Sequence, residues 1–134
     1  MTNLLFRNAL NRLPQATPPI WFMRQAGRYH SHYQALKKNH TFEELCKNPE
    51  LAAETALGPI NDFDFDVSIL FSDILFPLEA LGMGLKYDPG PIFNKFINPN
   101  NIKELISVDE AIVKLMFQSD ALKLTRELLP KNKS

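Results

Sequence analysis

At residues 66–73 the chain has the sequence DVSILFSD, a short and nearly continuous apolar run that ends in Asp73. Such a run is typical of a strand in a parallel sheet whose two faces are covered by helices. A second apolar run, Ile20 to Met23, follows Pro18-Pro19, which favours an extended backbone. We predict that it is also a buried strand, and it leads directly into Arg24.

Helices are predicted before, between and after these two strands. Thr41 and Glu44 have the spacing of a capping box, and Pro49 suits the first turn of a helix. We expect that helix to run to about Asn61, although Gly58-Pro59 favours a kink or an early end. Further helical stretches are expected over residues 3–12, 31–38 and 107–129, with a short helix or turn after Pro77 and a loop at 88–91.

Strands that alternate with helices, and that carry polar residues at their ends, indicate an α/β fold in which catalytic groups lie at the carboxyl ends of the strands. We expect the N-terminal part of a (β/α)8 TIM barrel, incomplete in this chain, with residues 1–134 as a single partial domain. A complete barrel takes about 250 residues, and two strands cannot close one.

Composition narrows the class of protein. The chain has 134 residues, 45% of them hydrophobic and 22% charged, as expected for one globular domain. Its single cysteine, Cys46, cannot form an intrachain disulfide, and its N-terminus does not resemble a signal peptide. No stretch approaches the roughly 20 apolar residues that cross a bilayer. These features predict a soluble, cytoplasmic protein that does not associate with membranes.

Charge is distributed unevenly along the chain. The net charge is zero, but residues 1–42 contain six Lys or Arg and no Asp or Glu. Residues 43–134 contain the other nine basic residues and all 15 acidic ones. A basic block of this kind indicates an anionic ligand, nucleic acid or an acidic partner surface, and a merely solvated basic face is the alternative.

Two arginines follow the first predicted strand. Arg24 and Arg28 are four residues apart, and their guanidinium groups suit bidentate binding of carboxylate or phosphate. Gly27 would let backbone N–H groups approach the same anion. The alternative is a loop whose arginines pair with acidic residues of the protein itself.

Asp73 is the second candidate, because an unpaired buried carboxylate costs several kcal/mol and needs donors, a cation or a ligand. Alternatively, Asp73 caps a helix that starts at Ile74. His30 and His32 are weak candidates for a metal pair, since no third ligand has suitable spacing. Cys46 has no obvious base beside it and is expected to be a buried, unreactive thiol.

Four blocks of sequence, in order along the chain, carry a family resemblance. Residues 19–29 read PIWFMRQAGRY, residues 44–52 read ELCKNPELA, and residues 69–75 read ILFSDIL, followed by ALGMG at 80–84. Together they resemble the uroporphyrinogen decarboxylase family. The resemblance is close over residues 4–93 and looser over the last forty.

The resemblance implies a cofactor-free and metal-free (β/α)8 enzyme of heme biosynthesis, usually a homodimer, that does not bind nucleic acid. Its substrate is uroporphyrinogen III, whose four acetate groups become methyls to give coproporphyrinogen III. Arg24 and Arg28 would bind substrate carboxylates and be catalytic, with help from the N–H groups of Gln25, Ala26 and Gly27. An arginine of this loop is the favoured proton donor.

In the same resemblance, Asp73 matches the acid that accepts hydrogen bonds from the pyrrole N–H groups. Its charge would stabilise the cation that forms when a pyrrole carbon is protonated. Lys37 stands where the family often has an arginine, so it is a weaker candidate for binding a carboxylate. His30-Ser31-His32 replaces the usual Leu-Pro-Glu.

The resemblance also implies that later binding residues lie beyond Ser134. We therefore expect the 134-residue chain to be inactive alone and to need a complementing C-terminal fragment. One alternative is a non-catalytic remnant or split-gene subunit that binds tetrapyrrole or a partner. Another is a cobalamin-linked methyltransferase, which shares the barrel and uses zinc but lacks the loop at 24–28.

Overall fold

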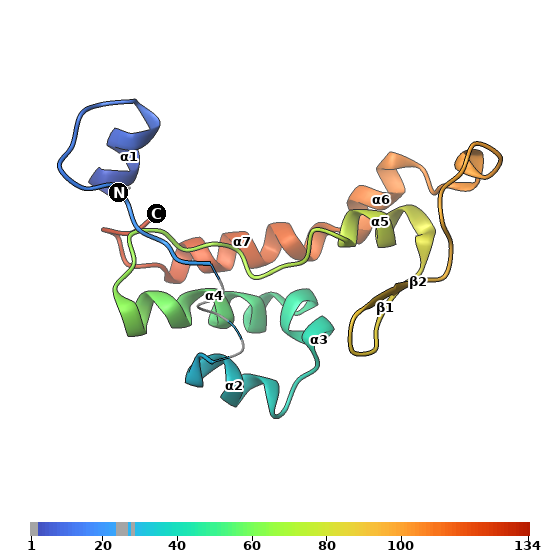
Figure 1. Ribbon diagram of the computed structural model, residues 1–134, viewed down its shortest axis with the longest axis horizontal. Coiled ribbons are helices and arrows are strands. Elements are labelled where there is room, and N and C mark those ends of the chain that lie inside the picture. Colours follow the sequence, from blue (N-terminus) through green and yellow to red (C-terminus); the bar gives the residue numbers. More distant parts are fainter. Residues whose placement is uncertain (1–2, 24–26, 28) are drawn as a thin grey trace.

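The computed structural model describes residues 3–23, 27 and 29–134, and within them the chain is mostly helical. Two helices, α4 (Pro49–Phe63) and α7 (Met116–Leu128), lie side by side along the middle of an elongated molecule (Figure 1). Helix α1 (Leu4–Leu10) lies at one end, near both chain termini, and a β-hairpin lies toward the other end.

The remaining elements are short. They are α2 (Ser31–Lys37), α3 (Phe42–Lys47), α5 (Phe76–Leu78), the π-helical turn η1 (Glu79–Met83), β1 (Leu85–Tyr87), β2 (Pro91–Phe93), the 3-10 turn η2 (Ile102–Glu104) and α6 (Val108–Lys114).

The predicted helix starts are confirmed, and side-chain caps explain them. The Thr41 hydroxyl accepts from the Glu44 backbone N–H at 3.2 Å, and Glu44 accepts from the Thr41 N–H at 2.7 Å, which completes the capping box. Asn48 caps α4 by accepting from the Leu51 N–H at 2.9 Å, and Ser107 caps α6 by accepting from Glu110. Each of these contacts joins two residues that are three positions apart, so the local sequence specifies them.

Two details of the helices differ from expectation. Helix α4 continues through Pro59 and ends at Phe63, shortly after the predicted end near Asn61, so the alternative of an early end at Gly58-Pro59 is wrong. Pro59 is buried with Ala56 and Ile60, and packing of that face outweighs the loss of one backbone hydrogen bond. The helical stretch predicted for 107–129 is interrupted at Leu115, which packs against the core around Phe76.

The two predicted strands are wrong. Residues 20–23 and 66–71 run through the molecule without helical turns, but the described residues form only a two-stranded sheet made of β1 and β2. Ile20, Phe22 and Met23 are 41%, 58% and 72% exposed, so this run is not buried either. A strand needs backbone partners along its edges, and the described part of the chain supplies them only at the start of each segment.

Hydrogen bonds at those starts bring three segments together. The Asp66 N–H donates to the Ile20 carbonyl at 3.0 Å, and the Ser134 N–H donates to the Asp66 carbonyl at 3.0 Å. The Ser68 N–H in turn donates to the Ser134 carbonyl at 2.6 Å. Ser134 is thus bonded to both Asp66 and Ser68, which are two positions apart in the sequence. This is the hydrogen-bond pattern of neighbouring parallel strands. Ile20, Asp66 and Ser134, which are separated by helices along the chain, thus lie next to one another in chain order.

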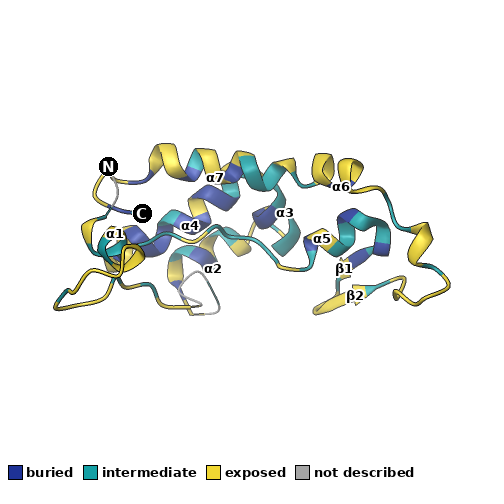
Figure 2. Ribbon diagram, turned by 90° about the horizontal axis from the view of Figure 1, so that it is seen from above, coloured by how far each residue is buried: buried dark blue, intermediate teal, exposed yellow. Residues whose placement is uncertain are grey.

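The core is divided between two clusters of buried residues. Figure 2 shows that buried residues lie mainly along α3, α4 and α7 and around β1. One cluster contains Cys46, Phe76 and Leu85 and continues into partly buried aromatic rings of α3, β1 and α7. The other contains Ile60, Phe65 and Leu129, with Trp21 packed against it. None of the helices in the described ranges is long and apolar enough to cross a membrane.

The expected loop at 88–91 is the turn of a hairpin that the sequence did not predict. β1 and β2 pair antiparallel, with Lys86 opposite Ile92, and Pro91 is the first residue of β2. Pro is tolerated at the first position of a strand, which is where it lies here. Leu85 and Tyr87 of this hairpin reach the first core cluster.

Asp66 joins the segments through its side chain as well as its backbone, so Asp66→Ala should lower the free energy of unfolding by about 1–2 kcal/mol. Its Oδ1 accepts from the Asn3 amide at 3.0 Å and its Oδ2 accepts from the Ile20 N–H at 2.8 Å. Urea denaturation measures the change. Asp120→Ala, which removes only an exposed pair with Lys123, is the matched control. Equal midpoints for the two variants would contradict the role of Asp66.

Candidate functional site

A cavity of about 770 Å³ lies beside the segment 69–74. This volume is within the range of small-molecule sites. It is mainly apolar, with a few polar groups near one end. The lining residues are Trp21, Met23, Ala56, Pro59, Ile69, Leu70, Phe71, Ser72, Asp73, Ile74, Pro77 and Gln118.

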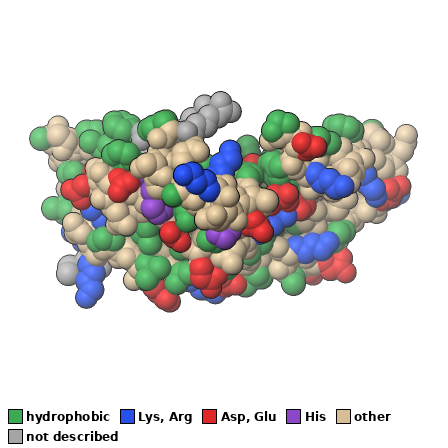
Figure 3. Space-filling model, turned by 90° about the horizontal axis from the view of Figure 1, so that it is seen from below, with side chains coloured by type: hydrophobic (Ala, Val, Ile, Leu, Met, Phe, Trp, Pro, Cys, Tyr) green, Lys and Arg blue, Asp and Glu red, His purple; other side chains and the backbone are tan. Residues whose placement is uncertain are grey.

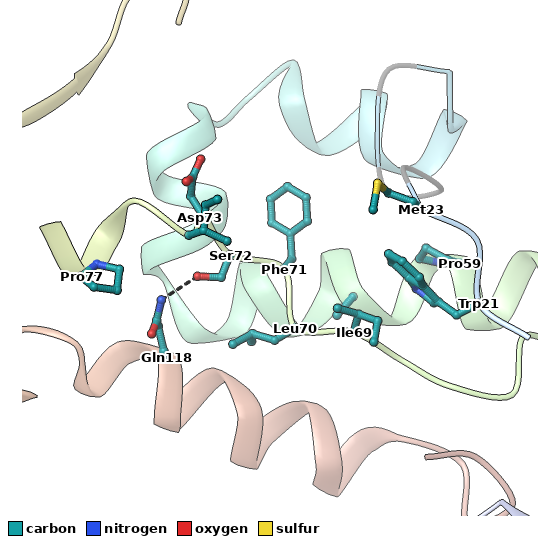
Figure 4. Close-up of a pocket in the computed structure, with 12 residues that line it drawn as sticks. Trp21, Met23, Pro59, Ile69, Leu70, Phe71, Ser72, Asp73, Pro77 and Gln118 are labelled. Carbon is teal, nitrogen blue, oxygen red and sulfur yellow. Dashed lines mark hydrogen bonds between the residues drawn. The ribbon is translucent and has the colours of Figure 1, made fainter. Parts of the chain in front are cut away.

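Side chains alternate along the segment that forms this wall (Figure 4). Phe71 and Asp73 project to one side of the segment, and Ser72 projects to the other side, toward α7. There the Gln118 side-chain amide donates to the Ser72 hydroxyl at 2.8 Å. This bond ties the polar end of the cavity to α7.

Asp73 is half-buried, and one of its oxygens has a structural task. Its Oδ1 accepts from the Leu75 N–H at 2.8 Å, and its carbonyl accepts from the Phe76 N–H at 3.4 Å. Asp73 thus forms a side-chain turn just before α5, but it is not the cap of that helix, whose N-cap residue is Leu75 and has no side-chain cap. A carboxylate has further acceptor sites, so this turn leaves capacity for a ligand.

Two titratable side chains lie close to Asp73, the partly buried Tyr87 and the buried Cys46. Burial, followed by the interaction with Asp73, raises the pKa of the Tyr87 hydroxyl well above its usual value. That hydroxyl is buried, and no described group meets it with hydrogen-bond geometry, so the two residues are neighbours without a formed bond. Burial and the charge of Asp73 also raise the pKa of the Cys46 thiol to about 12. This agrees with the expected unreactive thiol.

Most of the predicted carboxylate-binding loop lies outside the described residues: Arg24, Gln25, Ala26 and Arg28. Gly27 is described, and its carbonyl accepts from the His30 N–H at 3.1 Å and from the Gln34 side chain at 3.3 Å. Met23, directly before the loop, lines the cavity that Asp73 also lines. Met23 and Asp73 therefore border the same hollow.

Lys37 lies in the last turn of α2, with its side chain exposed, and is not among the residues that line the cavity. The face of the molecule seen in Figure 3 carries acidic and basic side chains intermingled. On that face, charge of one sign does not gather into a large patch.

Both histidines of the sequence analysis have acidic partners. His30 Nε2 is 2.7 Å from Asp62 Oδ2, and His32 Nε2 is 3.8 Å from Glu54 Oε1. Across the described residues, no three His, Cys, Asp or Glu side chains are arranged to hold a metal ion.

Sequence analysis missed Gln118, Tyr87 and Trp21 as neighbours of the candidate site. Gln118 is 46 residues from Ser72 along the chain, and nothing in the α7 sequence distinguishes it from a solvent-facing polar residue. Tyr87 reaches Asp73 only because the hairpin folds back on α3 and α5. Only a prediction of the hairpin at residues 85–93 could have identified Tyr87 as a neighbour of Asp73.

Comparison with known proteins agrees with the family resemblance of the four sequence blocks. The family model described as uroporphyrinogen decarboxylase (URO-D) matches residues 1–133. A uroporphyrinogen decarboxylase of Citrifermentans bemidjiense is 42% identical over 127 residues, which cover 95% of this chain and 38% of that protein. One of Myxococcus xanthus is 39% identical over 130 residues, covering 96% and 37%. The chain spans less than two fifths of the length of these relatives.

The raised pKa of Cys46 makes its reactivity predictable. With a pKa of about 12, only about one thiol in 10⁴ is ionised at pH 8, and the thiolate is the reactive form. The native chain should therefore react with a disulfide reagent at pH 8 at least about 100-fold more slowly than the same chain in urea. Spectrophotometry of the released thiolate measures both rates, and comparable rates would show that the site around Cys46 is open.

Proposed function

This chain belongs to the uroporphyrinogen decarboxylase family, and from that premise we propose that it contributes the acidic and arginine-bearing part of a uroporphyrinogen III decarboxylase. In this reaction four acetate side chains lose carbon dioxide and become methyls, which gives coproporphyrinogen III. The observation that carries the proposal is that Asp73 and Met23, the residue directly before the arginine loop, border one cavity of about 770 Å³.

The arginine loop is assigned to the carboxylates of the substrate. Uroporphyrinogen III carries eight carboxylates, and guanidinium groups bind carboxylates through paired hydrogen bonds. Arg24 and Arg28 would hold them, and the backbone N–H groups of Gln25, Ala26 and Gly27 would add donors. Lys37 could supply a further cation at longer range. The excess of basic residues in the first third of the chain favours such an anionic ligand.

Asp73 is assigned to the centre of the macrocycle. Its free acceptor capacity suits the pyrrole N–H groups, which are donors only. Protonation of a pyrrole carbon makes the ring cationic, and the electron pair of the bond to the departing carboxylate then flows into the ring. A fixed negative charge under the ring stabilises that cation as it forms. An arginine of the loop is our candidate for the proton donor.

The proposal includes assembly, because the chain covers only 38% of the length of the related enzyme. Ile69 and Ile74 are 47% and 90% exposed, and residues 69–72 form no backbone–backbone hydrogen bond within the described chain. Such a segment suits pairing with a further strand. Residues 1–134 are then one partial domain of a TIM barrel that works as a cytoplasmic homodimer, and turnover requires the remainder.

The same exposed segment favours a second candidate function. The chain could act as a non-catalytic subunit that binds tetrapyrrole or a protein partner. Complementation separates the two functions. The remaining part of the Citrifermentans bemidjiense enzyme should restore carbon dioxide release when mixed with this chain, and neither part should turn over alone. Tight binding between the parts without turnover would favour the non-catalytic subunit.

Binding of uroporphyrinogen III to the purified chain under anaerobic conditions tests the site directly. Arg24→Ala should weaken binding about tenfold or more, because a hydrogen bond to a charged group contributes about 1.5–3 kcal/mol. Asp73→Asn should weaken it by a similar factor, since the amide replaces an anionic acceptor with a partly donating group.

Matched controls come from residues far from the cavity. Arg7→Ala in α1 and Asp109→Asn in α6 remove an exposed charge of the same sign and should leave the dissociation constant within about twofold. An effect of the controls equal to that of Arg24→Ala and Asp73→Asn would mean that binding depends on net charge alone. No binding by the wild-type chain would refute this assignment for residues 1–134.

A further inference from the structure

The wall of the cavity that ends in Asp73 is joined to α7 through a side chain. The Gln118 amide donates to the Ser72 hydroxyl at 2.8 Å (Figure 4). Ala121 and Thr125 follow Gln118 at spacings of three and seven, so they share its face of the helix. They are 0% and 5% exposed, and α7 lies along α4. Gln118 therefore projects from the packed side of α7, which gives its amide a firm support.

The residue before Gln118 holds the chain on the other side of Asp73. The Phe117 ring packs edge to face against the Phe76 ring, with centroids 5.6 Å apart. Phe76 is fully buried in the first core cluster. Ser72 and Phe76 lie before and after Asp73 in the sequence, so two consecutive residues of α7 hold the chain on both sides of the carboxylate.

Between these two points, the backbone is bonded after Asp73 but not before it. Asp73 Oδ1 accepts from the Leu75 N–H at 2.8 Å, and the Asp73 carbonyl accepts from the Phe76 N–H at 3.4 Å. Residues 69–72, in contrast, form no backbone–backbone hydrogen bond with other described residues. On this side of Asp73, the bond from Gln118 is thus the polar contact that fixes the direction in which Ser72 points.

The direction of Ser72 also sets the direction of Asp73. Ser72 projects toward α7, whereas Asp73 projects to the opposite side of the segment (Figure 4). Because successive side chains of an extended segment point to opposite sides, a rotation that turned Ser72 away from α7 would turn Asp73 as well.

We propose that Gln118 is a positioning residue, whose bond to Ser72 fixes the side of the segment to which the Asp73 carboxylate points. The role of Asp73 toward a porphyrinogen rests on the proposed function. The positioning itself rests on the distance between Gln118 and Ser72, the alternation of the side chains and the turn at residues 73–76. Without this bond the carboxylate samples more than one orientation, and a ligand must order it on binding.

Gln118→Met tests the proposal, because Met is also a long, unbranched side chain but has no donor. The first readout, on the ligand-free 134-residue chain, is the set of three-bond NMR couplings that report the χ1 angle of Asp73. The wild-type chain should show one staggered rotamer, and Gln118→Met should show an average over rotamers. Ser72→Ala, which removes the acceptor, should do the same.

The second readout is the dissociation constant for uroporphyrinogen III under anaerobic conditions. Gln118→Met and Ser72→Ala should each raise it about fivefold, as expected for the loss of one neutral hydrogen bond. In an Asp73→Asn background, Gln118→Met should raise it by less than about twofold further, because Gln118 acts through Asp73. The same fivefold increase in both backgrounds would show that Gln118 acts independently of Asp73 and would overturn the proposal.

Gln15→Met is the matched control. It makes the same substitution at a glutamine whose amide donates to the Leu5 carbonyl at 3.1 Å and which does not line the cavity. It should leave the Asp73 couplings unchanged and the dissociation constant within about twofold of the wild-type value.

An unchanged Asp73 rotamer in Gln118→Met and Ser72→Ala would also overturn the proposal, as would an unchanged dissociation constant once the rotamer preference is lost. Should either variant fail to fold, the other decides. If the wild-type chain binds no uroporphyrinogen, the proposed function fails, and the couplings still decide whether Gln118 positions Asp73.

Discussion

One residue, Asp66, connects most of the chain. Its carboxylate binds Asn3 and the Ile20 N–H, its own N–H donates to Ile20, and its carbonyl accepts from Ser134. Both termini and the segment before the arginine loop therefore meet at one point. Nearby, the buried Lys133 ammonium donates to the Asp64 carbonyl at 2.9 Å and pairs with its carboxylate at 2.6 Å. These bonds hold the start of segment 20–23 beside segment 66–73, together with the packing of Trp21 and Phe22 near Phe65.

The position of the candidate site depends on these hydrogen bonds around Asp66. The chain leaves Asp66, passes along the cavity and reaches Asp73, where it turns into α5. The segment that starts at Ile20 runs beside it and leads to the loop at 24–28. Fixing Ile20 beside Asp66 thus places Met23 and Asp73 at the same hollow. This arrangement leaves apolar side chains exposed along both segments. Because exposed apolar surface favours association, the proposed function includes assembly with further chain.

How far sequence predicts this structure depends on the range of the interactions. Thr41, Asn48 and Ser107 each cap a helix through a residue three positions away, so their helices could be located from sequence. The strand predictions failed because residues 20–23 and 66–71 would need neighbours that the described chain does not provide. Gln118, Tyr87 and Asp62 were missed because each meets its partner across 14 to 46 residues, and no local pattern marks such pairs.

The central claim is that residues 1–134 already assemble one face of a porphyrinogen site around Asp73 and the arginine loop. The most direct measurement is to map backbone amide NMR shifts of the chain during anaerobic addition of uroporphyrinogen III. The account predicts that the shifts concentrate at residues 23–30 and 70–75 and at Gln118. Shifts centred instead on α6 or the outer face of α7, or spread evenly over basic residues, would contradict it.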